Sequence, residues 1–203
     1  MKTKILFFLI IMTVFACNKD DDPAPQDQIA KLPPETQTGA NTFGCIINNQ
    51  VFYPRDGKSE LFSPGGKGII FWGDPTDPSG YGNYDELEIR NLIDGKPCSK
   101  MIIHLQNLHQ TQVGEYVWKT SNFQSSIDGL MQNYVYAKIY DNATNSWKFY
   151  GSYENSGKVT ITKYANDNTI ISGNFSGKLR LKNGIEEIDI LNGRFDINLA
   201  TLP

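Results

Sequence analysis

A six-residue stretch near the C-terminus, Arg194-Phe195-Asp196-Ile197-Asn198-Leu199, places an apolar side chain at every second position. This period-two alternation is typical of a β-strand that has one face buried and the other face in water. The same pattern recurs in four earlier stretches, which are residues 86–90, 101–106, 159–162 and 174–181. Strands with one wetted face favour an antiparallel sheet.

The whole chain supports an all-β fold. About ten strand-like segments, separated by Gly, Asn and Asp turns, predict an antiparallel β-sandwich or a closed β-barrel, and the pattern leaves both open. Residues 43–47 and 50–53 predict a hairpin that turns at Asn48-Asn49, because Asn tolerates positive φ. Residues 68–72 predict a short strand, and residues 120–130 predict one helical turn or an irregular loop. The formal net charge of −3 gives no reason to expect a nucleic-acid partner.

The N-terminus is organised like an export signal. Lys2 and Lys4 precede the uncharged residues 5–14, which are too few to span a bilayer, since that takes about 20 apolar residues. Ala16 then precedes Cys17, and this arrangement resembles the bacterial lipoprotein signal. The resemblance implies cleavage before Cys17 and acylation of its sulfur, which would anchor the protein to the membrane. The alternative is an ordinary secretory peptide with an incidental cysteine.

These features predict three regions: a signal peptide over residues 1–16, a flexible lipidated tether over residues 17–31, and a single all-β domain over residues 32–203. At the start of the tether, Lys19-Asp20-Asp21-Asp22 resembles the short acidic signal that sends Bacteroidota lipoproteins to the outer face of the outer membrane. A solvated charged linker is the simpler interpretation of the same residues. We expect an outer-membrane protein exposed at the cell surface.

Three stretches of the domain carry a family resemblance. They are Leu32-Pro33-Pro34-Glu35-Thr36-Gln37-Thr38-Gly39-Ala40-Asn41-Thr42-Phe43-Gly44-Cys45, residues 171–177, and Asn192-Gly193-Arg194-Phe195-Asp196-Ile197. These stretches resemble the opening and the closing strands of a family of uncharacterised Bacteroidota surface lipoproteins. The resemblance implies an all-β secreted domain and implies no activity.

Two cysteines remain besides Cys17. In an oxidising compartment Cys45 and Cys98 are free to form a disulfide, which would close a loop of about fifty residues. Two separately buried thiols are the alternative.

Catalytic and metal-binding motifs are missing from the sequence. It contains no His-Glu-x-x-His, Cys-x-x-Cys, Gly-x-Ser-x-Gly or phosphate loop. His104 and His109 are five residues apart, which on a strand places them on opposite faces and argues against a shared metal. Asp74, Asp77 and Asp85 are weak calcium candidates, since the spacing does not match an EF-hand and Asp-Pro turns explain the first two. We therefore expect no enzyme and no cofactor.

One aromatic strand offers a candidate ligand platform. Tyr134, Tyr136 and Tyr140 share a face, next to Trp147 and Tyr150 on the following segment. Aromatic rings with polar tips suit a glycan or a protein partner, whereas packing in the core or across strands is the alternative. The expected function is a non-enzymatic binding or structural accessory module. The alternatives are a barrel that binds a small apolar ligand and a glycan hydrolase with an unrecognised carboxylate pair.

Overall fold

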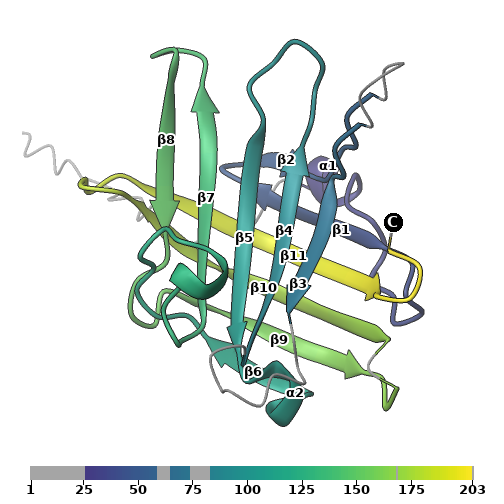
Figure 1. The fold of residues 1–203 in the computed structure, drawn as a ribbon. Coiled ribbons are helices and arrows are strands. Elements are labelled where there is room, and N and C mark those ends of the chain that lie inside the picture. The colour runs from purple at the N-terminus through teal and green to yellow at the C-terminus, as the bar shows by residue number, and fades with distance from the viewer. Residues whose placement is uncertain (1–25, 59–64, 74–82, 168, 203) are drawn as a thin grey trace, which may run out of the picture.

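The fold is an antiparallel sheet of eleven strands that curls into a half-barrel (Figure 1). A computed structural model describes residues 26–58, 65–73, 83–167 and 169–202. The strands are β1 (Thr42–Ile47), β2 (Gln50–Phe52), β3 (Ile69–Gly73), β4 (Tyr84–Asn91), β5 (Ser99–Gln106), β6 (Gly114–Val117), β7 (Tyr134–Asp141), β8 (Ser146–Gly151), β9 (Gly157–Tyr164), β10 (Ile170–Leu181) and β11 (Glu187–Asn198). Three short helical elements accompany them: α1 (Gln26–Ile29), α2 (Leu108–Thr111) and the 3-10 helix η1 (Ser126–Asp128).

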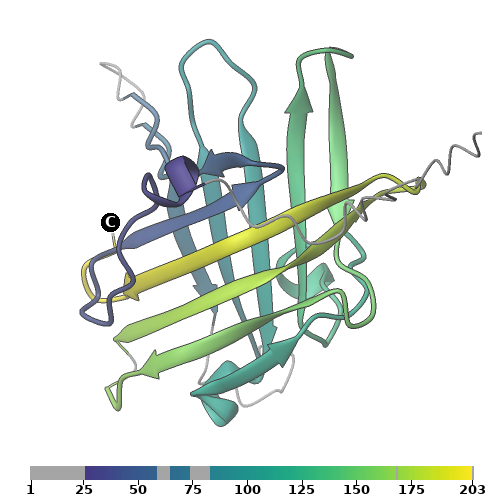
Figure 2. The same cartoon turned by 180° about the vertical axis from the view of Figure 1, so that it is seen from behind.

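The sheet forms two layers whose strands cross. One layer has the order β3-β4-β5-β7-β8, and the other has the order β2-β1-β11-β10-β9-β6, as the two opposite views show (Figures 1 and 2). Strand β10 joins the layers, because residues 171–177 pair with β9 while Arg180 and Leu181 pair with β8. Among the described strands, β3 pairs only with β4, so the sheet remains open and the closed-barrel alternative is not realised.

The hydrophobic core fills the space between the two layers. Trp118, Ile103 and Leu179 are fully buried there, together with alternate residues of most strands. Close packing also explains Gly193, because a Cβ at this position would lie 2.5 Å from the ring of Phe175. The period-two pattern thus correctly identified the apolar side chains of β4, β5, β9, β10 and β11 that face this core.

The N-terminal hairpin and the loop after β6 agree with the sequence. Strands β1 and β2 pair across Asn48 and Asn49, whose φ angles of 46° and 64° are the left-handed values that favour Asn in a tight turn. Residues 120–131, here called the cover segment, form an irregular loop that contains only η1, as predicted for residues 120–130.

The N-terminal part of the described chain crosses the outer face of the second layer. Helix α1 falls within the stretch that the sequence assigned to the tether, yet its Ile29 packs against Leu32 and Ile46, so it belongs to the fold. Residues 33–41, here called the strap, then run across β10 and β11. The carboxylate of Asp196 accepts hydrogen bonds from three strap amides and from Thr36, which fixes the strap to the sheet.

Candidate functional site

The open end of the half-barrel contains a concavity with apolar side chains from both layers. This mouth cleft has a volume of about 500 Å³ and is bordered by the β1–β2 turn, the β4–β5 connection and the β7–β8 turn. Its lining consists of Ile47, Asn48, Gln50, Val51, Phe52, Asn91, Ile93, Lys96, Pro97, Ser99, Ile139, Tyr140, Asn142, Tyr150 and Ile188. Ligand sites of small β-proteins commonly lie at such mouths and enclose 300 to about 1,000 Å³.

Both layers contribute apolar walls to the mouth cleft. Phe52 and Ile188 come from the second layer and belong to the core, while Ile139 and Tyr150 come from the first. The hydroxyl of Tyr150 donates to Glu186 Oε1 at 2.5 Å. Burial, followed by this hydrogen bond, raises the pKa of Tyr150 to about 12, so the phenol remains neutral and presents an uncharged wall.

A few polar groups interrupt the apolar surface. The side-chain oxygen of Asn91 is buried and accepts no hydrogen bond from any described residue. Ser99 accepts a hydrogen bond from the backbone N–H of Tyr140 at 3.3 Å, and Lys96 is the charged group among the lining residues. The mouth cleft therefore combines apolar walls with several polar side chains and one cation, and the unmatched oxygen of Asn91 lies buried in its wall.

The predicted aromatic platform is not formed as a surface. Tyr134, Tyr136 and Tyr150 are all buried. Tyr134 and Tyr136 do share the outer face of β7, as the alternation predicted, but the cover segment lies over them: Tyr134 donates to the carbonyl of Gln124 at 2.9 Å. The platform interpretation is wrong for these three residues, and the alternative of core and cross-strand packing is correct.

The remaining two platform residues lie farther along the same face. The rings of Tyr140 and Trp147 meet edge to face with centroids 5.1 Å apart, and the Lys138 ammonium lies 4.2 Å from the Trp147 ring. Both rings are half-buried by this cross-strand contact. Tyr140 is nevertheless part of the mouth cleft, and so is Tyr150, so two of the five predicted residues line the concavity.

The two histidines lie in separate environments. His104 is 1% exposed on β5, and its Nδ1 lies 2.7 Å from Oε1 of the fully buried Glu86. Its ring stacks between those of Tyr84 and Tyr134, at 5.1 and 4.4 Å. His109 is on α2 rather than on a strand, and its Nδ1 lies 3.1 Å from the hydroxyl of Tyr164. The argument against a shared metal had placed both histidines on one strand, and this placement is wrong for His109.

The Glu86–His104 pair carries two unmatched polar atoms. The backbone N–H of Ser126, in the cover segment, donates to Glu86 Oε1 at 2.9 Å. Glu86 Oε2 and His104 Nε2 are buried without a hydrogen-bond partner among the described residues. The sequence pattern had assigned both side chains to a wetted face, so this buried pair was not predicted.

The calcium candidates are only partly described. Asp74 and Asp77 lie outside the described residues. Asp85 lies on β4 and is buried, and this burial raises the pKa of its carboxyl to about 7. Within the described parts of the chain, no group of three or more His, Cys, Asp or Glu side chains is arranged to hold a metal ion.

The disulfide alternative is not realised. Cys45 and Cys98 are free thiols. Cys45 lies in the core, where burial raises the pKa of its thiol, whereas Cys98 is half-buried before β5 and its Sγ lies 3.6 Å from the carbonyl of Ser99. The charges that act on Cys98 are those of Arg90, Glu88 and Lys100, so its environment differs from that of Cys45.

Comparisons of the chain with protein-family models, with curated proteins and with solved structures found no significant match. Cys17, the predicted site of lipid attachment, and the predicted signal peptide precede the described residues. From Gln26 onward, none of the helices in the described ranges has the length and apolar character needed to cross a membrane.

Most residues of the mouth cleft were not predicted from the sequence. Ile93, Lys96 and Pro97 belong to a connection between strands, and Asn48 and Asn142 belong to turns. The alternation of each strand indicated which side chains face inward, but it carried no signal for which strand ends meet at the open end of the half-barrel.

Proposed function

We propose that the protein is a lipid-anchored lipoprotein of the outer membrane, displayed at the cell surface, whose folded domain binds a small and mainly apolar ligand. The observation that carries this proposal is the mouth cleft of about 500 Å³, with apolar walls from both layers. The anchor is Cys17, supported by the lipoprotein-like signal that precedes it and the acidic residues that follow it.

The composition of the cleft supports binding rather than catalysis. The described lining residues include no His, Cys, Asp or Glu, which are the usual proton carriers and nucleophiles of hydrolytic sites. The Glu86–His104 pair is of that type, but it lies on the outer face of the first layer under the cover segment. The titratable groups that line the cleft are a lysine and two tyrosines.

The cleft also indicates the chemistry of the ligand. An apolar body would cover Phe52, Ile139 and Ile188, and at about 25 cal/mol per Å² this burial would supply most of the affinity. One N–H or O–H group would pair with the buried oxygen of Asn91, which accepts no hydrogen bond from any described residue, once that side chain turns toward the cleft. Helix α1 contacts β2, which borders the cleft, so the anchored end of the chain enters the domain next to the ligand site.

Fluorescence titration with N-phenyl-1-naphthylamine tests the proposal, because this probe joins an apolar body to a single N–H group. The protein is the chain from residue 18 onward, which keeps every described residue. We expect saturable binding that Ile93→Glu weakens at least about tenfold, because the new carboxylate would be desolvated against the probe.

The matched control is Ile127→Glu, which makes the same change at a residue of η1 that is 79% exposed and does not line the cleft. This variant is expected to bind the probe as the unmodified chain does. Equal affinity in all three proteins, or no saturable binding by the unmodified chain, would contradict a ligand site in the mouth cleft.

A further inference from the structure

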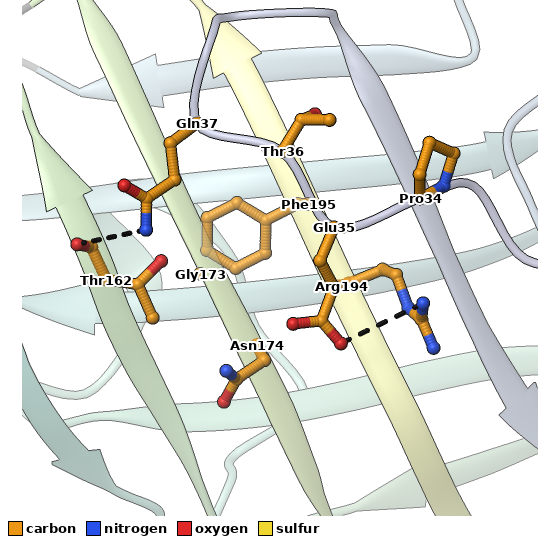
Figure 3. Close-up of a pocket in the computed structure, with 9 residues that line it drawn as sticks. All are labelled: Pro34, Glu35, Thr36, Gln37, Thr162, Gly173, Asn174, Arg194 and Phe195. Carbon is orange, nitrogen blue, oxygen red and sulfur yellow. Dashed lines mark hydrogen bonds and ion pairs between the residues drawn. The ribbon is translucent and has the colours of Figure 1, made fainter.

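A second concavity lies on the opposite side of the second layer, beneath the strap. It has a volume of about 270 Å³ and is shown in Figure 3. Its floor is the outer face of β9, β10 and β11, with Thr162, Asn174 and Arg194, and its other wall is formed by the strap residues Glu35 and Gln37. This strap pocket shares no residue with the mouth cleft.

The frame of the strap pocket is firmly held. Next to it, Asp196 accepts hydrogen bonds from Thr36 Oγ1 at 2.6 Å, from the amide of Gly39 at 2.9 Å and from the hydroxyl of Ser172 at 2.7 Å. These short bonds to a charged acceptor tie the strap to both β10 and β11. The wall and the floor of the pocket are therefore fixed relative to each other before any ligand arrives.

The polar groups inside the pocket, in contrast, hold one another weakly. Gln37 Nε2 donates to the carbonyl of Thr162 at 3.4 Å, and Arg194 Nη1 donates to the carbonyl of Pro33 at 3.3 Å. Arg194 Nη1 and Glu35 Oε1 are 3.8 Å apart. Good N–H···O bonds have lengths of about 2.9–3.0 Å, so each of these groups retains capacity for a better partner. The side-chain amide of Asn174 bonds to no other described side chain or backbone group.

We propose that the strap pocket binds a small uncharged polyhydroxyl molecule of the size of a single sugar ring. Adjacent hydroxyl groups both donate and accept, and the pocket offers both functions. Arg194 donates, Glu35 accepts, and the amides of Asn174 and Gln37 do both. Because the Arg194 side chain is only 15% exposed, its hydrogen bonds to a ligand would be partly shielded from water.

Charge and size narrow the ligand class further. Arg194 and Glu35 bear opposite charges, so an anionic ligand would meet the carboxylate and a cationic ligand would meet the guanidinium. A neutral ligand avoids both of these repulsive contacts. The volume of about 270 Å³ lies just below the range of sites for drug-sized molecules, which suits one ring rather than a chain.

The experiment is a ¹⁵N-edited NMR titration of the chain from residue 18 onward. The probes are glucose, galactose, mannose and N-acetylglucosamine, each as a free monosaccharide, with sodium acetate as the anionic comparison. At least one neutral sugar is expected to shift the side-chain N–H signals of Arg194, Asn174 and Gln37. Asn174→Ala is expected to weaken that sugar about tenfold, because it removes a donor and an acceptor. The matched control is Ser176→Ala, on an exposed residue of the same face of β10 that does not line the pocket.

Three results would overturn the proposal. In the first, none of the four sugars shifts the three side-chain signals. In the second, a sugar binds Asn174→Ala and Ser176→Ala equally well. In the third, acetate alone shifts the signals, which would assign the pocket to carboxylates. Backbone spectra of both variants that match the unmodified chain show that the strap is intact. Binding of N-phenyl-1-naphthylamine at the mouth cleft is measured separately, so either site can fail without the other.

Discussion

Asp196 fastens the strap to the second layer, so we predict that Asp196→Ala will strongly destabilise the domain. The Asp196 residue is 1% exposed, and its carboxylate accepts hydrogen bonds from the amides of Thr38, Gly39 and Ala40 as well as from three hydroxyl groups. The donors come from strap residues that are 156 to 160 positions away in the chain and from β10. Alanine would leave all of them without their acceptor.

The magnitude follows from the number of donors and their burial. A buried donor that loses its partner costs about 1–3 kcal/mol, and hydrogen bonds to a charged acceptor are at the high end of the range. Because the strap is at the surface, water would replace some of these hydrogen bonds. The loss of unfolding free energy is therefore smaller than the sum of the costs for the individual donors. We expect Asp196→Ala to lower the free energy of unfolding by about 4 kcal/mol at pH 7.

The loss should also depend on pH. Burial alone would raise the pKa of Asp196, but hydrogen bonds from Thr36, Ser172 and the amides of Ala40 and Gly39 outweigh it and lower the pKa from 3.8 to about 2. A carboxyl whose pKa is lower in the folded state stabilises the fold fully above its unfolded pKa. That stabilisation is lost as the pH falls through the folded value. The lowered pKa of Asp196 corresponds to about 2 kcal/mol of stability. The difference in unfolding free energy between Asp196→Ala and the unmodified chain should therefore shrink by about that amount between pH 6 and pH 2.

Urea denaturation followed by circular dichroism at a series of pH values measures both effects. The control is Asp189→Ala, on the same strand but exposed, which we expect to change the free energy of unfolding by less than about 0.5 kcal/mol. Hydrogen exchange adds a local measurement, because the amides of Thr38, Gly39 and Ala40 should lose protection first in Asp196→Ala. A loss below about 1 kcal/mol at pH 7, or one that is constant down to pH 2, would refute the reasoning.

Three further predictions concern other parts of the chain. His104→Ala should lower the free energy of unfolding by about 3–5 kcal/mol in urea denaturation, because Glu86 would stay buried without its imidazole partner; a loss below about 1 kcal/mol would contradict this. In the chain from residue 18 onward, Cys98 should react with a thiol reagent in the folded protein and Cys45 only after denaturation; the absence of free thiols in denatured, unreduced protein would instead show a disulfide. In bacteria that produce the full chain, Cys17→Ser should abolish incorporation of labelled fatty acid, and unchanged labelling would exclude acylation of Cys17. In the same bacteria, replacement of Asp20 to Asp22 by Ala should reduce cleavage of the protein by protease added to whole cells. Unchanged cleavage would exclude the acidic residues as a surface signal.

The sequence was sufficient to predict most of the strands and, where the alternation is clear, the face that a strand buries. In β11, Phe195 and Ile197 enter the core while Arg194 remains on the outer face, as alternation requires. The turn between β1 and β2 was also predictable, because Asn48 and Asn49 adopt positive φ angles that few other residues tolerate. The strand alternation and the turn both depend on residues that are close together in the chain, so they can be predicted from a single sequence.

The choice between sandwich and barrel depends instead on how β10 divides its pairing. Residues 171–177 bond to β9 and residues 180–181 bond to β8, which lets one continuous sheet fold into two crossing layers without closing. Each of these pairings has the same alternating pattern as any other antiparallel pair. The position of the mouth cleft follows from this division, and for that reason its residues could not be predicted from periodicity.

Alternation also fails to distinguish an outer face in water from an outer face that another segment covers. Glu86, Tyr134 and Asp196 all occupy outer positions, and each would be expected to meet solvent. The cover segment buries the first two and the strap buries the third, and the strap lies more than 150 residues from Asp196 in sequence. In each case the covering chain brings backbone groups that bond to the outer side chain, so the polar atoms buried there find partners. The strap pocket has the same origin, because strap residues and strand residues meet there with their hydrogen bonds only partly satisfied. In addition to the mouth cleft, polar residues at outer strand positions can thus line a binding site in this fold where a distant segment crosses above them.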